Sequence, residues 1–404
     1  MNSTDYTFGP KRILMTADTL GGVWTYAVEL ASALKDHRVE IALATMGRRL
    51  SKDQRQQTQA LGNVTVFESN YKLEWMDNPW LDVEAAGEWL LDLEERVKPD
   101  LIHLNGYAHA SLSFRAPKLV VGHSCVLSWW RAVHGTDAPA EWNAYREAVA
   151  QGLRAADLTI APSRAMLDAL EEHYGPLGAS MVIPNGRPAP PLDCSRKEKI
   201  ILTAGRLWDA AKNVSALAAI APEVPWPICV AGEEKDPNGR ENHFNHVHCL
   251  GRLSWEQLSS WYARSAIYAL PARYEPFGLS ILEAGLAGCA LVLGDIPSLR
   301  EIWHDAALFV PPEDPEVLKD ALRELSSSPA WIADLGSKAR RVAIGLTPER
   351  MAAGYRQAYG QLLEQACSTR ARRSTTDERA SSDSRPGRAE ERSSEAWVEK
   401  GFAA

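Results

Sequence analysis

The chain has 404 residues, which is enough for two or three domains that each bury a core of their own. Hydrophobic residues make up 45%, charged residues 24%, and the formal charge is −8, a balance that argues against a protein held on nucleic acid or on an anionic bilayer. The 6 cysteines form no Cys-x-x-Cys pair and no apolar run approaches the ~20 residues of a membrane span, so we expect a cytoplasmic protein with reduced cysteines and no zinc site.

In the first half of the chain, short β-branched segments alternate with segments that have apolar residues at helical spacing. This alternation predicts a doubly wound α/β domain with a parallel sheet. The expected helices include residues 162–175, with Ser163 as the N-cap and Gly175 just past the end. The other expected helices are residues 24–35 and 84–98, and the expected strands are residues 12–18, 38–46, 63–69, 100–107, 118–124 and 157–163.

A proline-rich stretch at residues 182–199 interrupts this pattern and predicts a hinge, after which the alternation begins again. The second set of expected strands is residues 199–205, 227–232, 247–251, 266–271, 289–295 and 307–312, and the expected helices are residues 213–221, 254–265, 278–288 and 315–328.

We therefore expect two Rossmann-like domains, residues 1–187 and 188–346, with a helix at 347–366 that packs back on the first domain. Residues 367–404 carry many charges of both signs and little that could be buried. This composition predicts a disordered C-terminal tail.

The segment YEPFGLSILEA places Glu275 in a bent loop and Glu283 inside the helix that follows. The loop comes after an expected strand, at the edge of the sheet where ligands bind in this kind of fold. At the start of the helix, the amides of Gly278, Leu279 and Ser280 favour an anion, and phosphate is the common occupant. Glu283 lies deeper in the helix and suits the two hydroxyls of a ribose. The alternative is a surface glutamate followed by a helix salt bridge.

Two cations, Arg206 and Lys212, follow the first strand of the second domain. At this edge they would hold a diphosphate and offset the charge it gains as it leaves, and the alternative is a solvated basic pair. Gly21 and Gly22 form an open turn at the same position in the first domain, where they suit a loop that approaches a phosphate or sugar from across the cleft. They do not form Gly-x-Gly-x-x-Gly, so a nicotinamide site is poorly supported.

These segments, EPFGLSILEA, AGRL followed by KN, VIPNG and the early glycine pair, together resemble the family 4 glycosyltransferases of GT-B fold. The resemblance covers about residues 12–363. It implies two Rossmann-like domains that face each other across a cleft. It also implies retaining transfer of a sugar from a nucleotide-diphosphate sugar, held mainly by the second domain, to an acceptor held mainly by the first.

The resemblance assigns a role to each matching residue. It implies that Arg206 and Lys212 bind the diphosphate, that Glu283 binds the ribose, and that Glu275 lies beside the transferred sugar as a catalytic residue. It also matches His123 to a first-domain histidine near the donor sugar, with Ser124 where family members usually have an acidic residue. The turn beside Glu275 matches Phe277, Gly278 and Leu279.

The chain has no Asp-x-Asp pair to hold Mg²⁺ or Mn²⁺ against a diphosphate, so we expect transfer without a metal and without a cofactor other than the donor nucleotide sugar. Trp129, Trp130 and Arg131 follow His123 and suit a sugar or polyol platform, against the alternative of a loop packed on a neighbouring helix. The basic stretch at residues 46–57 suits loose peripheral contact with an anionic membrane that carries a lipid-linked acceptor. The alternative for that stretch is an exposed loop.

The sequence therefore predicts a hexosyltransferase that acts on a glycan or a lipid-linked sugar of cell-surface polysaccharide synthesis. Two alternatives stay open. One is a nucleotide-sugar isomerase or hydrolase on the same scaffold, which would use the donor site without an acceptor. The other is a catalytically silent nucleotide-binding protein, for which the complete set of glutamates, arginine and lysine is unexpected.

Overall fold

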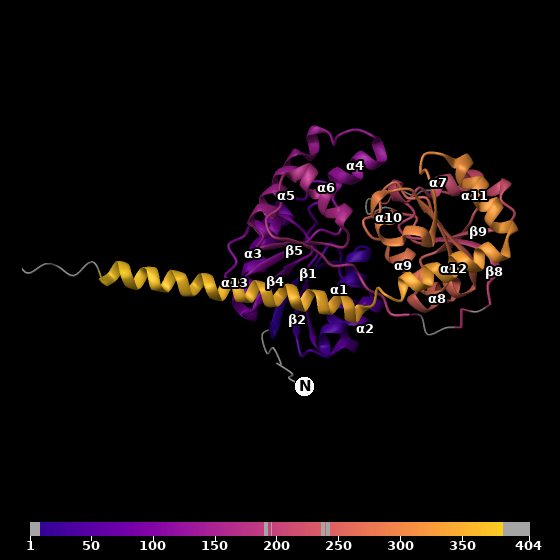
Figure 1. The fold of residues 1–404 in the computed structure, drawn as a ribbon. Helices are drawn as coiled ribbons and strands as arrows, with labels where there is room; N and C mark the ends of the chain where they lie inside the picture. Colours follow the sequence, from indigo (N-terminus) through magenta and orange to yellow (C-terminus); the bar gives the residue numbers. More distant parts are fainter. Residues whose placement is uncertain (1–8, 190–192, 195, 236–238, 240–242, 383–404) are drawn as a thin grey trace, which may run out of the picture. The chain divides into compact units, whose positions relative to one another are not determined.

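A computed structural model describes residues 9–189, 193–194, 196–235, 239 and 243–382, with side chains as far as residue 368. The described residues up to Leu363 form one compact unit. This unit contains two parallel sheets, one from the first half of the chain and one from the second, each with helices packed against it (Figure 1). The predicted fold class, two doubly wound α/β sheets, is confirmed.

In the described residues, the first sheet has seven strands in the order β3-β2-β1-β4-β5-β6-β7. The order reverses between β1 and β4, so the loops after these two strands diverge and leave room for a ligand. The strands are β1 (Arg12–Asp18), β2 (Glu40–Met46), β3 (Val64–Glu68), β4 (Leu101–Leu104), β5 (Lys118–Val121), β6 (Leu158–Ala161) and β7 (Ser180–Val182). The helices are α1 (Gly22–Lys35), α2 (Lys52–Leu61), α3 (Trp80–Val97), α4 (Val126–His134), α5 (Asn143–Ala155) and α6 (Arg164–Tyr174).

The second sheet repeats this arrangement with six strands in the described residues, in the order β10-β9-β8-β11-β12-β13. Its reversal lies between β8 and β11, whose following loops carry the predicted cations and Glu275. The strands are β8 (Glu198–Ala204), β9 (Ile228–Ala231), β10 (His248–Gly251), β11 (Ser265–Leu270), β12 (Ala290–Gly294) and β13 (Ala307–Val310). The helices are the short η3 (Ala210–Lys212), α7 (Val214–Ile220), α8 (Trp255–Arg264), α9 (Leu279–Leu286), α10 (Pro297–Trp303), α11 (Pro315–Ser327) and α12 (Pro329–Ala343).

Local sequence signals explain where several elements begin and end. The Ser163 hydroxyl accepts a hydrogen bond from the Met166 amide at 3.2 Å, and Gly175 ends α6 with φ +85°, so both predicted ends of that helix are confirmed. Strand β7 was not predicted, because it has only three residues at the edge of the sheet and none of them is fully buried. Val182, the last residue of β7, is also the first residue of the predicted hinge.

Helix α13 (Pro348–Ser382) follows the second sheet in the chain, yet its first turns belong to the hydrophobic core that packs against the first sheet. Met351, Tyr355 and Tyr359 are buried there, and the Tyr359 hydroxyl lies 2.8 Å from Nδ1 of His103 on β4. The predicted helix ends at residue 366, whereas α13 continues to Ser382, and residues 361–385 contain no glycine or proline that would stop it. The rest of the predicted tail, residues 383–404, lies outside the described residues.

Candidate active site

The carboxyl ends of β1, β4, β8 and β11 open onto one cleft of about 1400 Å³ within the unit that ends at Leu363. Ligands are expected at these ends because the strand order reverses there in both sheets. The predicted catalytic and donor-binding residues all line this cleft: Gly21, Gly22, His123, Arg206, Lys212, Glu275, Phe277, Gly278, Leu279, Ser280 and Glu283. The fold therefore places in one cleft predicted residues as distant in the sequence as Gly21 and Glu283.

The loop that carries Glu275 is fixed by residues of both sheets. The backbone carbonyl of Glu275 accepts a hydrogen bond from the Ser298 hydroxyl at 2.6 Å. From the first domain, the Ser163 hydroxyl donates to the Pro276 carbonyl at 2.8 Å, and the Cys125 amide donates to the Tyr274 hydroxyl at 2.9 Å. A loop held by this many bonds keeps the Glu275 carboxylate in place without help from a ligand.

Helix α9 begins at Leu279, directly after Gly278, as the sequence predicts. Gly278 has φ +88°, a left-handed conformation that a side chain disfavours, and a Cβ there would lie 2.6 Å from the Ile281 side chain. The amides in the first turn of a helix have no partner within the helix itself. They therefore face the cleft with the positive end of the helix dipole behind them, as an anion site requires.

The cation pair, Arg206 and Lys212, lines the same cleft as this helix end, and each cation bonds a carboxylate. Lys212 Nζ lies 2.5 Å from Oε2 of Glu275, and Arg206 donates to Oδ2 of Asp209 at 2.9 Å. The glycine turn of the first domain closes the other side, since a Cβ on Gly21 would lie 3.8 Å from the Arg206 side chain. Both cations retain further N–H groups for a diphosphate.

Glu283 has a partner that the sequence did not indicate. Its Oε1 accepts from Nε of Arg187 at 2.8 Å, and the same guanidinium also bonds Glu29 of α1 and lies 4.3 Å from the ring of Trp255. Burial raises the pKa of Glu283 and of Glu29 above the ordinary value, and the charge of Arg187 works against that rise. Arg187 follows VIPNG directly, so its place in the hinge was the available signal. The assignment of Glu283 to a ribose stays a prediction.

His123 also has a partner, Asn105, that the sequence analysis missed. The Asn105 amide nitrogen donates to the Thr16 carbonyl at 2.7 Å, which turns its oxygen toward Nε2 of His123 at 2.8 Å. An oxygen at that position requires the proton on Nε2 and leaves Nδ1 as an acceptor. Burial lowers the pKa of His123 to about 3, so the ring is neutral near pH 7. The signal for Asn105 was its position directly after β4, at the reversal of strand order.

Comparison with known proteins agrees with this geometry. Residues 20–188 match the family model described as glycosyltransferase family 4, and residues 198–328 match the model described as glycosyl transferases group 1. The chain belongs to the family 4 glycosyltransferases of GT-B fold. This confirms the resemblance predicted from the motifs.

The solved structures most useful for this comparison share the fold at low sequence identity. Sucrose-phosphate synthase from Thermosynechococcus elongatus aligns with a TM-score of 0.72 and 19% identity, over 88% of this chain and 99% of that one. The Anabaena protein HepE, solved in complex with UDP-glucose, aligns with a TM-score of 0.68 and 18% identity, over 88% and 99% of the two chains.

Among curated relatives, O-antigen chain mannosyltransferase B of Escherichia coli is 32% identical over 85 residues, which are 21% of this chain and 22% of that protein. In three of these relatives, the region that matches this chain makes up only between 22% and 61% of the relative's length.

The three residues predicted to bind the acceptor take different positions. Trp129 lines the cleft, and its indole N–H donates to Oδ1 of Asp209 at 2.9 Å. Trp130 does not line the cleft, and its ring lies 4.4 Å from that of His134. Arg131 also lies outside the lining residues and forms ion pairs with Asp137 and Glu172. Only Trp129 of these three therefore faces the space where substrates would meet, and the binding roles themselves stay predictions.

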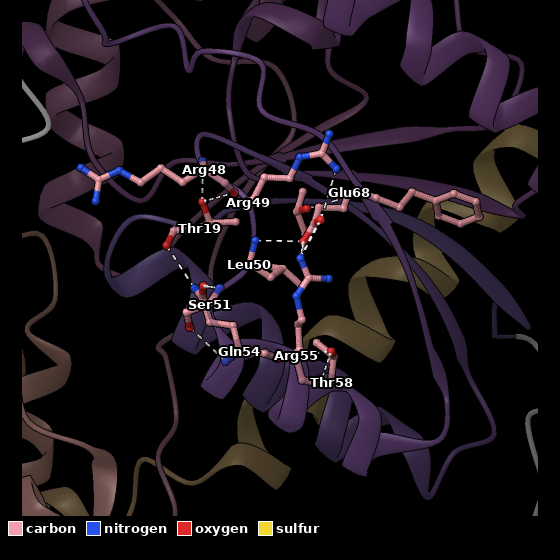
Figure 2. Close-up of polar contacts among 11 residues, drawn as sticks. Thr19, Arg48, Arg49, Leu50, Ser51, Gln54, Arg55, Thr58 and Glu68 are labelled. Carbon is pink, nitrogen blue, oxygen red and sulfur yellow. Dashed lines mark hydrogen bonds and ion pairs between the residues drawn. The ribbon is translucent and has the colours of Figure 1, made fainter.

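The basic stretch at residues 46–57 is partly loop and partly helix: residues 47–51 form a loop with Arg48 and Arg49 exposed, and residues 52–57 are the first turns of α2 (Figure 2). Ser51 and Gln54 form a capping box at the start of α2, with Ser51 Oγ 3.2 Å from the Gln54 amide and the Ser51 amide 3.0 Å from Gln54 Oε1. Arg49 and Arg55 both pair with Glu68, which makes part of the positive charge unavailable to a membrane. Loose peripheral contact stays a prediction.

Two further observations concern a metal ion and a membrane. In the described part of the chain, no three His, Cys, Asp or Glu side chains gather where they could hold a metal ion. Transfer without a metal stays a prediction. Likewise, none of the helices in that part combines the length and the apolar character needed to cross a bilayer.

Proposed function

We propose that the protein is a retaining glycosyltransferase that moves a hexose from a nucleotide-diphosphate sugar to a hydroxyl acceptor, without a metal. The acceptor is a glycan or a lipid-linked sugar of cell-surface polysaccharide synthesis. One observation carries the proposal: the cation pair, the amino end of α9 and Glu275 all line one cleft. The curated name O-antigen chain mannosyltransferase B and the UDP-glucose complex of HepE support the acceptor and donor classes.

The donor diphosphate would lie between the cation pair and the first turn of α9. As the bond from the sugar to the diphosphate breaks, negative charge grows on the departing oxygen, and fixed cations and amides stabilise it. Lys212 reaches both Glu275 and this position, because an ammonium group has three N–H donors. The proposed retention follows if the acceptor hydroxyl attacks on the face that the diphosphate leaves, where a phosphate oxygen can take its proton.

His123 is proposed to bind the donor sugar as a neutral ring. Its Nε2 donates to Asn105, so its Nδ1 can accept a hydrogen bond from a sugar hydroxyl. Glu275 would accept hydrogen bonds from other hydroxyls of the same sugar. Both groups then hold the hexose while the diphosphate leaves, which is positioning rather than covalent catalysis.

The test begins with a panel of UDP-, GDP-, ADP- and dTDP-sugars, because a ligand that binds only the folded state raises the unfolding temperature. The donor identified in this way is then assayed for transfer to glycan and lipid-linked acceptors in the presence of a chelator. We expect Glu275→Gln and Arg206→Ala each to lower transfer about a hundredfold or more. The matched control is Arg264→Ala, which breaks an exposed pair with Glu198 in the same domain.

Each outcome discriminates among the functions considered. Undiminished transfer by both variants would discard the assignment of the site, and transfer that needs a divalent cation would discard the metal-free mechanism. Isomerised or free sugar formed equally fast without an acceptor would favour the isomerase or hydrolase. Nucleotide binding with no turnover on any acceptor would favour the silent binding protein.

A further inference from the structure

Asp209 lies where an acidic residue is unexpected, next to the cation pair proposed to hold the diphosphate. Its side chain is only 4% exposed, and it is the N-cap of η3, the short helix that ends at Lys212. Because like charges repel, a carboxylate at this position would oppose the binding of a diphosphate. The fold must therefore compensate its charge or use it.

Three donors compensate this carboxylate, two from its own loop and one from a distant part of the chain. Arg206 donates to Oδ2 at 2.9 Å, and the Ala211 amide donates to Oδ1 at 3.0 Å. The third donor is the indole N–H of Trp129, which reaches Oδ1 at 2.9 Å from helix α4 of the first domain. Burial alone would raise the pKa of Asp209, but the charges of Arg206 and Lys212 and these hydrogen bonds outweigh it and leave the pKa below the ordinary value.

The contact with Trp129 crosses between the domains. Asp209 and Arg206 lie between β8 and η3 in the second predicted domain, whereas Trp129 lies on α4 in the first. If the domains separate, Asp209 loses one of its two donors on Oδ1 and attracts Arg206 more strongly. The Arg206 guanidinium then has less freedom to turn toward the diphosphate.

We propose that Trp129 is a positioning residue for the donor site: through Asp209, it holds the Arg206 guanidinium in the orientation that binds the diphosphate. This inference rests on the proposed function, because it takes the diphosphate to be the ligand of Arg206. Donor binding then depends on the position of the first domain. By linkage, a bound donor favours the arrangement in which Trp129 and Asp209 are in contact.

The experiment measures the affinity for whichever of UDP, GDP and ADP raises the unfolding temperature most. Trp129→Phe should weaken this affinity about tenfold, since the lost hydrogen bond is to a charged group. In an Asp209→Asn background, the same substitution should change the affinity less than twofold, because Trp129 acts through the Asp209 carboxylate. Trp89→Phe, a partly buried tryptophan of α3 that does not line the cleft, is the matched control.

A second variant removes the donor alone. 3-Benzothienylalanine at position 129 keeps the shape of the indole and replaces its N–H with sulfur, so it should reproduce the loss seen with phenylalanine without disturbing the fold. An unchanged affinity with 3-benzothienylalanine would overturn the proposal. An equal effect of Trp129→Phe in the native and Asp209→Asn backgrounds would overturn it too, because the loss would then come from packing of the ring and not from the hydrogen bond.

Arg206→Ala separates this failure from failure of the proposed function. If Arg206→Ala weakens nucleoside diphosphate binding but Trp129→Phe does not, only the role of Trp129 is overturned. If neither variant weakens it, the diphosphate is not bound by Arg206, and the proposed donor site itself is wrong.

Discussion

The two faces of the cleft handle charge in different ways. On the first-domain face, burial lowers the pKa of His123 to about 3, so its ring is neutral near pH 7, and raises the pKa of Asp18 to about 7, so its carboxyl is only about half ionised there. On the second-domain face, cations are paired with carboxylates, Lys212 with Glu275 and Arg206 with Asp209. Neutral polar groups suit the hydroxyls of sugars, whereas fixed charges suit a diphosphate. This contrast fits the proposed function, in which the first face contacts sugar hydroxyls and the second holds the diphosphate.

The largest expected effect comes from removing a fixed charge from the second face. Lys212→Met leaves Glu275 without its cation and the departing diphosphate with one less partner, so we expect transfer to fall by a factor of about 10² to 10³. Initial rates with saturating donor measure this. Lys338→Met is the control, because Lys338 pairs with Asp334 on the exposed side of α12 and should leave the rate unchanged. Equal rates in both variants would contradict the role of the pair.

A stability effect of several kcal/mol is expected where the two faces meet. Arg187 is 6% exposed and holds Glu29 of the first domain and Glu283 of the second. Arg187→Met leaves the buried Glu283 and the partly buried Glu29 without their cation, which should lower the free energy of unfolding by about 3–5 kcal/mol. Arg264→Met, which breaks an exposed pair with Glu198, should lower it by only about 0–1 kcal/mol. Denaturant unfolding of both variants gives the comparison.

The stability lost in Arg187→Met should also change with pH in a definite direction. Burial raises the pKa of Glu29 and Glu283 in the native protein, and removing Arg187 takes away the charge that opposes this rise. A folded-state pKa above the unfolded value means that the folded state binds protons more tightly, so stability falls as pH rises through that range. The deficit of Arg187→Met should therefore shrink as the pH is lowered from 8 toward 5. A deficit that is constant over this range would contradict the ionic explanation.

A smaller effect is expected from Asp18, the group of the first face whose charge changes near neutral pH. Burial raises the pKa of Asp18 to about 7, with the Leu20 amide and the charges of Arg206 and Arg48 opposing that rise. Above pH 7 the Asp18 carboxylate competes for Arg206 and repels the diphosphate. The KM for the donor should therefore rise by about three- to tenfold between pH 6 and pH 8. Asp18→Asn should remove this dependence. Asp295→Asn, which affects an exposed pair with Arg300, should leave it intact.

The sequence was sufficient to predict those parts of the fold that depend on local pattern. The apolar β-branched runs located β1 and β11, and Ser163 located the start of α6, because period and capping chemistry act over a few residues. It missed α2, whose mean hydropathy is low and whose start is fixed by a Ser51–Gln54 capping box among charged residues. Helix α12 was missed as well, although proline at its first position was a signal.

The site was predicted as a set of residues but not as a set of contacts. The glycosyltransferase motif identified Glu275, Glu283 and the cation pair, since these follow strands at the edge of a sheet. Asn105 was missed although it directly follows β4, whereas Arg187 and Asp209 were missed because each has a partner that lies far away in the sequence. Arg187 lies 96 positions from Glu283, and Trp129 lies 80 positions from Asp209. Such pairs are set by how the two domains pack, which no local pattern encodes.

The smallest expected effect concerns a single hydroxyl that connects the two faces. Ser163 Oγ accepts from the Met166 amide as the N-cap of α6 and donates to the Pro276 carbonyl beside Glu275. Ser163→Ala should lower the free energy of unfolding by about 1–2 kcal/mol, because it removes the cap and leaves a buried carbonyl without its donor. Ser328→Ala is the matched control, since Ser328 caps α12 through the Trp331 amide and does not line the cleft.

The comparison of these two caps separates stability from function. Both variants lose a cap, so both should unfold more easily, with Ser328→Ala at about 0.5–1 kcal/mol. Only Ser163→Ala also releases the loop that holds Glu275, so it alone should lower kcat, by about three- to tenfold, at a temperature where both variants remain folded. Equal kcat values in the two variants would mean that the loop is held well enough by Ser298 and Tyr274. The first domain would then contribute substrate-binding groups to the cleft without fixing the geometry of its opposite face.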